Sequence, residues 1–80
     1  MEIKRNKQNG GLYTVVEKDG KYYYFDLTYL PYSRFNNVEC MAFECDENGH
    51  VTDWGEVFVD FPESVSEENL RACVEKFMNE

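Results

Sequence analysis

Apolar and polar residues alternate along much of the chain in a pattern that predicts β-strands. Four stretches have this pattern: Leu12 to Lys18, Lys21 to Leu27, Val38 to Asp46 and Val51 to Phe61. Asp19-Gly20 and Asn48-Gly49 separate them pairwise and favour hairpin turns of type I′, in which both central residues have positive φ. The stretch 28–37 between the two hairpins contains Pro31, which lacks the N–H that a strand ladder needs, so we expect a connector there.

The C-terminal part follows the period of a helix instead. Pro62 ends the last predicted strand, and Ser64 with Glu67 fits a capping box, while Ser66 is an alternative N-cap. The apolar residues that recur at helical spacing are Leu70, Cys73, Val74 and Phe77. These features predict a helix over residues 64–79.

Together the elements predict an α+β fold of a single domain, residues 1–80. It consists of a four-stranded antiparallel β-meander over residues 12–61 with one C-terminal α-helix packed on one face. Residues 1–11 are polar and basic, and we expect a flexible arm there with Ile3 against the sheet. One helix covers one face of four strands, so the other face is expected to be partly open to water.

Alternation along each strand assigns side chains to these two faces. The side chains expected on the helix side are those of Tyr23, Phe25, Leu27, Met41, Phe43 and Cys45. Those expected on the open face are Tyr22, Tyr24, Cys40, Ala42 and Glu44. In the last strand the alternation changes phase, which predicts a β-bulge at Gly55-Glu56. Such a bulge puts Trp54, Val57, Val59 and Phe61 on one face and leaves Asp53, Glu56 and Asp60 in water.

The charge is strongly negative: 16 acidic residues against 8 lysines and arginines give a net charge of −8. This field repels nucleic acid and anionic membranes and attracts basic protein surfaces. The N-terminus lacks the apolar segment of a signal peptide, and no apolar run approaches the length of a membrane span. The 3 cysteines lack the dense spacing of a secreted disulfide scaffold. We therefore expect a reduced, cytoplasmic protein that binds neither nucleic acid nor membranes directly.

No segment carries a catalytic motif or a cofactor fingerprint, and we expect neither enzymatic activity nor a cofactor. Cys40 and Cys45 are five apart on one strand and point to opposite faces, so they cannot share a zinc ion. Residues 44–56 have oxygen-bearing side chains at alternate positions like an EF-hand loop, but Glu44 stands first and Gly55 twelfth. We expect a hairpin without metal there, and a calcium loop is the weaker hypothesis.

Residues 45–57 read CDENGHVTDWGEV. This segment is similar to one that recurs in short uncharacterised proteins from phages and mobile elements of Gram-positive bacteria, roughly CDENGxVTDWxEV. In those proteins a helix led by Ser/Thr-Glu-Glu follows, as Ser66-Glu67-Glu68 does here. The resemblance implies no catalytic residue. In size and acidity the chain also resembles anti-CRISPR proteins, many of which are compact acidic domains that occupy a basic nucleic-acid channel.

These observations favour a small, non-enzymatic binding protein. We expect it to dock an acidic and aromatic surface onto a basic partner such as a nuclease or a nucleic-acid-binding complex, as a phage-encoded inhibitor of the DNA-mimic type. The predicted partner-binding residues are Tyr22, Tyr24, Asp46, Glu47, Asp53, Glu56, Phe58 and Asp60. The alternative is an assembly module that forms a homodimer through the open sheet face or an edge strand and has no inhibitory role.

Overall fold

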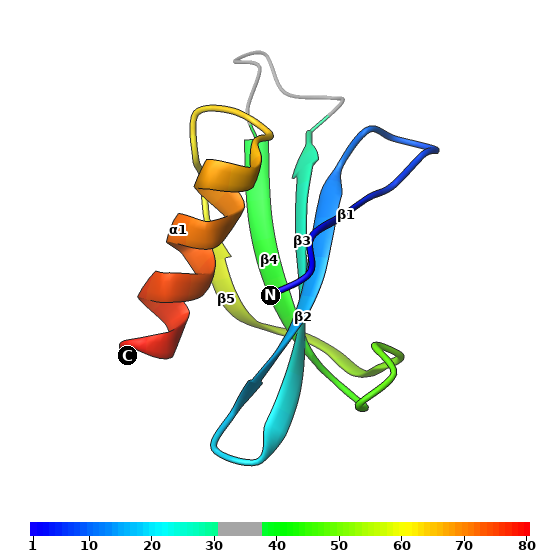
Figure 1. Ribbon diagram of the computed structural model, residues 1–80, viewed down its shortest axis with the longest axis vertical. Coiled ribbons are helices and arrows are strands. Elements are labelled where there is room, and N and C mark those ends of the chain that lie inside the picture. The colour runs from blue at the N-terminus through cyan, green and yellow to red at the C-terminus, as the bar shows by residue number, and fades with distance from the viewer. Residues whose placement is uncertain (31–37) are drawn as a thin grey trace.

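The computed structural model describes residues 1–30 and 38–80, and Figure 1 shows one sheet with one helix beside it. The elements are β1 (Lys4–Arg5), β2 (Leu12–Lys18), β3 (Lys21–Tyr29), β4 (Val38–Cys45), β5 (Val51–Asp60) and α1 (Glu67–Met78). The strands follow one another as antiparallel neighbours in the order β1-β2-β3-β4-β5. The predicted α+β meander with one C-terminal helix is confirmed, with five strands instead of four. Pro31 lies outside the described residues.

The additional strand comes from the basic N-terminal segment. Lys4 and Arg5 pair with the start of β2, and the turn after them is closed by hydrogen bonds from Asn6 N to Gly11 O (2.7 Å) and from Gly10 N to Asn6 O (2.8 Å). Ile3 is partly buried against the core, as expected. Residues 1–11 thus form a short strand and a closed turn where the sequence predicted a flexible arm.

The two hairpin turns differ. Asp19 (φ 54°) and Gly20 (φ 82°) both have positive φ, so the type I′ prediction for the first turn is confirmed. At the second turn Gly49 has φ 86° whereas Asn48 does not have a positive φ, so the same prediction is wrong there. The reason is the Asp46 side chain, which accepts hydrogen bonds from the backbone N–H groups of Asn48 and His50, both at 2.9 Å. These bonds stabilise a longer loop that ends in one left-handed glycine.

The helix begins at Glu67, later than the predicted residue 64. Ser66 is the N-cap, and its hydroxyl accepts a hydrogen bond from Asn69 N at 3.2 Å. Ser64 does not cap the helix; its carbonyl oxygen accepts a hydrogen bond from the Asn69 side-chain amide at 2.9 Å. Of the two serines that the sequence offered, the second one therefore starts the helix.

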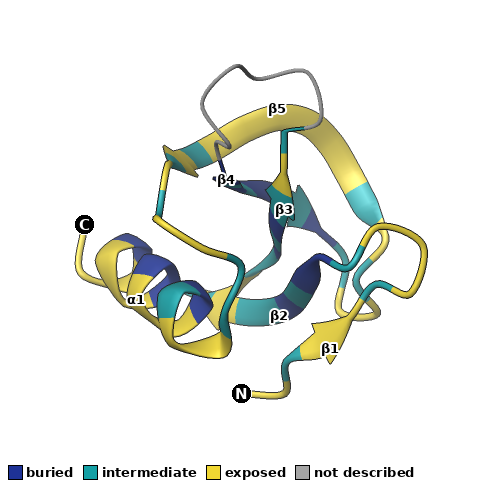
Figure 2. Cartoon of the chain, turned by 90° about the horizontal axis from the view of Figure 1, so that it is seen from above, coloured by how far each residue is buried: buried dark blue, intermediate teal, exposed yellow. Residues whose placement is uncertain are grey.

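The core lies between α1 and the sheet. Its buried members are Leu12, Phe25, Leu27, Val38, Cys40, Ala42, Leu70, Cys73, Val74 and Phe77. Figure 2 shows the sheet curving around these residues, with α1 close to β2 and with β5 arching on the opposite side. Phe77 is central, since its ring meets Tyr23 (4.8 Å between centroids) and Phe25 (5.5 Å) in edge-on contacts. Tyr23, Phe25 and Leu27 thus face the helix side, as predicted.

The predicted orientation of β4 is wrong. Leu27 is paired with Cys40 and Phe25 with Ala42, and directly paired residues of neighbouring strands lie on the same face. Cys40 and Ala42 therefore face the helix, while Met41, Phe43 and Cys45 lie on the other side. The sequence could not show this, because β4 is apolar at both parities: residues 38, 40, 42, 43 and 45 are all buried.

β5 departs from a regular ladder at two places. Its pairs with β4 are Cys40–Asp60, Met41–Val59, Ala42–Phe58, Phe43–Glu56 and Cys45–Val51. Val57 is therefore one extra residue, and residues 52–55 form a longer irregular stretch. The irregularity predicted at Gly55-Glu56 coincides with the end of the stretch 52–55, whereas the second irregularity, at Val57, was not predicted. As a result Phe58 and Asp60, both predicted to face water or a partner, lie on the helix side.

Candidate functional site

The outer edge of the sheet carries the main group of exposed apolar side chains. They are Trp54 (72% exposed), Val57 (44%), Val59 (41%) and Phe61 (60%). β5 is hydrogen-bonded to β4 alone, so its other edge has no neighbouring strand within the described sheet. Asp53 and Glu56 are exposed on the same strand. We call these six residues the β5 surface. It combines large apolar groups with negative charge, and an exposed group of large apolar side chains marks interaction sites.

Trp54 is held in place on one side only. Its ring meets the ring of buried Phe43 edge-on, with 5.2 Å between centroids and 63° between planes. Beside it the Asp53 carboxylate accepts a hydrogen bond from Gly55 N at 2.8 Å, which fixes the backbone around the indole. The rest of the indole is open to solvent. A supported aromatic ring with a free outer side is suited to contact another protein, because little further ordering is needed on binding.

The acidic residues of the β4–β5 hairpin continue the negative charge of this surface. Glu47 is exposed at the turn. The Asp46 carboxylate accepts hydrogen bonds from backbone N–H groups of its own turn. The bond from His50 N lowers the pKa of Asp46 below its ordinary value, as does the bond from Asn48 N. His50 Nδ1 lies 3.3 Å from Asp46 Oδ2. Of the predicted acids, Glu47, Asp53 and Glu56 are exposed, and one carboxylate oxygen of Asp53 accepts the hydrogen bond from Gly55 N.

Asp60 and Phe58 are not part of this outer surface. Lys76 Nζ donates to Asp60 Oδ2 at 2.7 Å, and this bond lowers the pKa of Asp60, assisted by the bond from Phe61 N. The ion pair joins β5 to α1 and balances the charge of Asp60. Phe58 packs against Phe77, with 6.1 Å between ring centroids. Both predicted contact residues therefore belong to the packing between helix and sheet.

Tyr22 and Tyr24 face away from the helix, as predicted, but both are half-buried. Tyr24 stacks on Tyr13 with 5.7 Å between ring centroids, and burial raises its pKa to about 12, with Asp26 adding to the effect. A hydrogen bond with Glu17, its neighbour across β2 and β3, raises the pKa of Tyr22. Both phenols thus remain protonated near neutral pH and are already engaged within the sheet.

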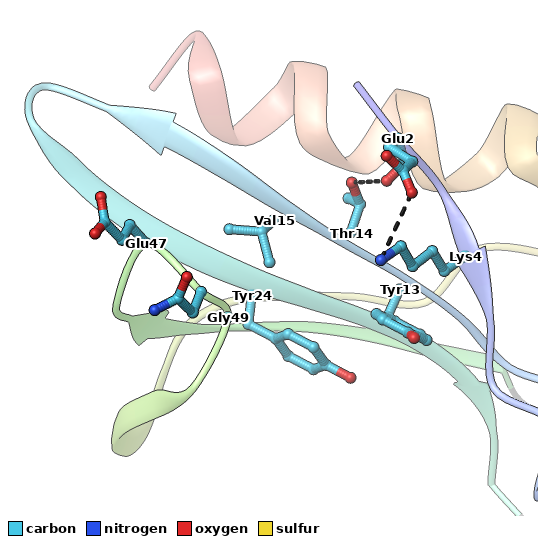
Figure 3. Close-up of a pocket in the computed structure, with 9 residues that line it drawn as sticks. Glu2, Lys4, Tyr13, Thr14, Val15, Tyr24, Glu47 and Gly49 are labelled. Atoms are coloured by element: carbon cyan, nitrogen blue, oxygen red, sulfur yellow. Dashed lines mark hydrogen bonds and ion pairs between the residues drawn. The ribbon is translucent and has the colours of Figure 1, made fainter.

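The tyrosine pair forms one side of a hollow of about 290 Å³, shown in Figure 3. Its lining residues are Glu2, Lys4, Tyr13, Thr14, Val15, Tyr24, Glu47, Asn48 and Gly49. A Cβ atom at Gly49 would stand 3.1 Å from Val15 Cγ2, so the tip of the β4–β5 turn lies directly on β2. Lys4 Nζ, beside Tyr13 in Figure 3, is 3.6 Å from Glu2 Oε1. Tyr24 and Glu47 both line the hollow, but its volume is at the lower limit of small-molecule sites.

No group of three or more His, Cys, Asp or Glu side chains within residues 1–30 and 38–80 is arranged to hold a metal ion. Over the same residues the structure contains no helix long and apolar enough to cross a membrane. Cys40, Cys45 and Cys73 are buried free thiols.

The exposure of the apolar residues on β5 was not foreseen from the sequence. One signal was available: both parities of this strand mix apolar and acidic residues, with Trp54 and Phe58 beside Glu56 and Asp60, and Val57 and Val59 beside Asp53. A strand with one buried face would separate the two classes. The mixture indicates an edge strand that is partly exposed on both sides.

Comparisons with protein-family models, with curated proteins and with solved structures find no match for this chain. The resemblance of residues 45–57 to phage proteins therefore stays a prediction.

Proposed function

We propose that this protein is a non-enzymatic binding module that docks its β5 surface onto a basic protein. The observation that carries the proposal is the exposure of Trp54, Val57, Val59 and Phe61 along an edge strand that also presents Asp53 and Glu56. Tryptophan is one of the residue types that are enriched among binding hot spots. Among residues 1–30 and 38–80, Trp54 is the most exposed of the large apolar side chains, at 72%. Its burial by a partner would provide the apolar centre of an interface.

The backbone of β5 also supports a role in binding another protein. A strand at the edge of a sheet presents N–H and C=O groups to any extended segment that aligns with it. A partner strand added to this edge would gain main-chain hydrogen bonds, while the side chains of Val57 and Val59 would meet its apolar positions. The irregular stretch 52–55 would limit such pairing to the C-terminal half of β5.

Charge selects the kind of partner. In a symmetric dimer formed through β5, Asp53 and Glu56 of the two copies would lie close together, and like charges directly opposite one another are destabilising. The net charge of −8 adds to this repulsion. A basic surface would instead be attracted at long range, and its association would be accelerated at low salt. We therefore favour a basic partner over the homodimer.

The sharpest form of the proposal is an inhibitor that mimics DNA. Glu47, Asp53 and Glu56 are exposed acids on one hairpin, and a groove that binds nucleic acid is lined with Lys and Arg. An acidic edge seated in such a groove would compete with the phosphate backbone. The resemblance to phage proteins and the small acidic character of the chain are consistent with this role against a nuclease or another nucleic-acid-handling protein.

The test is an affinity capture from nuclease-treated lysate of a Gram-positive bacterium, washed at low and at high salt. The double variant Asp53→Lys/Glu56→Lys reverses the charge of the β5 surface, and Trp54→Ala removes its apolar centre. Glu75→Lys/Glu80→Lys is the matched control, since it changes the net charge equally at exposed positions near the end of α1. We expect a basic protein that elutes with salt and is retained by the control but lost from both β5 variants.

Fluorescence then checks the contact with the purified partner. Trp54 is the sole tryptophan of the chain, and its indole is exposed. Its fluorescence emission should shift to shorter wavelength when the partner covers it. If all variants retain the bound protein equally, the β5 surface is not the binding site. Specific capture of a second copy of this chain would favour self-association instead.

A further inference from the structure

Two cysteines that are far apart in the sequence meet in the core. Cys40 on β4 and Cys73 on α1 are 0% and 2% exposed and belong to the same buried cluster. Asp60 is the direct neighbour of Cys40 across β4 and β5, and Cys73 Sγ lies 3.9 Å from Asp60 Oδ2. Both cysteines therefore adjoin the Asp60 side chain, Cys40 from the sheet and Cys73 from the helix. The fold brings the two thiols into the same part of the core.

Cys45 is different. It is also buried, but it lies on the face of the sheet away from α1, where its neighbours across the strands are Tyr22 and Val51. Of the 3 cysteines, Cys40 and Cys73 thus lie on the helix side of the sheet, and Cys45 is separate from them.

We propose that Cys40 and Cys73 are a modification site, at which a disulfide oxidant of the glutathione type converts the two thiols into one intramolecular disulfide between β4 and α1. This inference is independent of the proposed binding function, because it concerns the interior of the protein and not the β5 surface.

The reaction is a pair of thiol–disulfide exchanges. The Cys73 thiolate attacks glutathione disulfide, forms a mixed disulfide and releases one glutathione thiolate. Cys40, as a thiolate, then attacks the Cys73 sulfur and releases a second glutathione. The protein loses two protons and two electrons, and one glutathione disulfide becomes two glutathione thiols. Cys73 is the attacking group, because it lies on α1, the element that must move, and the Lys76 ammonium three residues along the same helix favours its thiolate.

Burial controls the rate. Neither thiol is accessible in the closed structure, so the exchange requires α1 to lift from the sheet. Once formed, the bond would close a loop of 34 residues, from Cys40 to Cys73, and hold the helix in place. A bridge over a loop of this length should raise the melting temperature of an 80-residue domain by about 10 °C or more.

The experiment equilibrates the full chain in buffers of increasing glutathione disulfide to glutathione ratio. Intact mass, peptide mapping and thermal melting are then recorded after quenching with acid. Cys45→Ser is the matched control, since it leaves the pair intact, whereas Cys40→Ser and Cys73→Ser each remove one partner. We expect the wild type and Cys45→Ser to lose two hydrogens, to yield a peptide that links Cys40 with Cys73, and to melt at a higher temperature.

Neither of the other two variants should show an intramolecular bridge, and far-UV circular dichroism would confirm that they are folded. Three free thiols at the most oxidising ratio would overturn the proposal. So would a bridge that includes Cys45, a bridge between two chains, or stable glutathione adducts without ring closure.

Discussion

Replacing Phe77 by alanine tests whether α1 is held on the sheet by the aromatic cluster. Phe77 is 5% exposed, and its ring meets Tyr23 at 4.8 Å, Phe25 at 5.5 Å and Phe58 at 6.1 Å. Lys18 Nζ also lies 4.4 Å from the centre of the ring. Alanine would remove all of these contacts and leave a cavity between helix and sheet.

The expected loss is large relative to the stability of such a small domain. Phenylalanine to alanine substitutions in protein cores cost about 3–5 kcal/mol. A domain of 80 residues has a total stability of about 4–12 kcal/mol. At roughly 4–8 °C for each kcal/mol, the melting temperature should fall by at least about 12 °C, and the variant will be close to unfolding at room temperature.

The assay is urea unfolding followed by far-UV circular dichroism, because the exposed Trp54 is a poor reporter of the core. Met78→Ala is the matched control: it is the next residue of the same helix, but it is 40% exposed and should change the stability by about 0.5 kcal/mol. Equal effects of the two substitutions, or a loss below about 1 kcal/mol for Phe77→Ala, would refute the packing described above. A two-step transition would mean that the helix leaves before the sheet unfolds.

Three further substitutions test the helix–sheet ion pair and the β4–β5 turn. The folded structure lowers the pKa of Asp60 from its ordinary value of 3.8, so its contribution to stability is present above that value and is lost as the pH falls through the folded pKa. Asp60→Asn should therefore lower the free energy of unfolding at about pH 7 and lower it less at about pH 2.5, as measured by urea unfolding. If wild type and variant differ in stability by the same amount at both pH values, the ion pair with Lys76 is contradicted. Gly20→Ala and Gly49→Ala should each lower the free energy of unfolding by about 1–2 kcal/mol, because alanine is strained at a positive φ. At Gly49 the new Cβ atom would also lie 3.1 Å from Val15 Cγ2, which adds to the loss. Thermal melting should show the larger loss for Gly49→Ala, and equal losses would mean that the turn does not rest on β2.

The sequence by itself determined the features that depend on neighbouring residues. Asp19-Gly20 specifies its turn because both positions need positive φ, whatever surrounds them. The stripe from Leu70 to Phe77 specifies which side of the helix is buried, because its spacing follows the helical period. The order of strands and the single C-terminal helix follow from these local signals.

The orientation of β4 needed the tertiary structure. This strand is apolar at both parities, so alternation within it carries no information on which face meets the helix. The pairing of Cys40 with Leu27 and of Ala42 with Phe25 decides the question, and that pairing depends on the register with β3. The approach of Cys40 and Cys73 to the same Asp60 side chain likewise depends on register, here between β4 and β5, and could not be predicted from the sequence.

The candidate surface was only partly predictable for a related reason. Asp53 and Glu56 are charged and were expected in water, and they are exposed. The sequence predicted that Trp54, Val57 and Val59 share one face of the strand and that Asp60 faces water. In the structure Val57 is the extra residue, and Phe58 and Asp60 therefore point toward the helix. Whether an apolar side chain is buried depends on what covers it. β5 is the last strand of the sheet, and α1, which lies mainly over β2 and β3, meets β5 at Phe58 and Asp60. The side chains on the outer side of β5 therefore remain exposed.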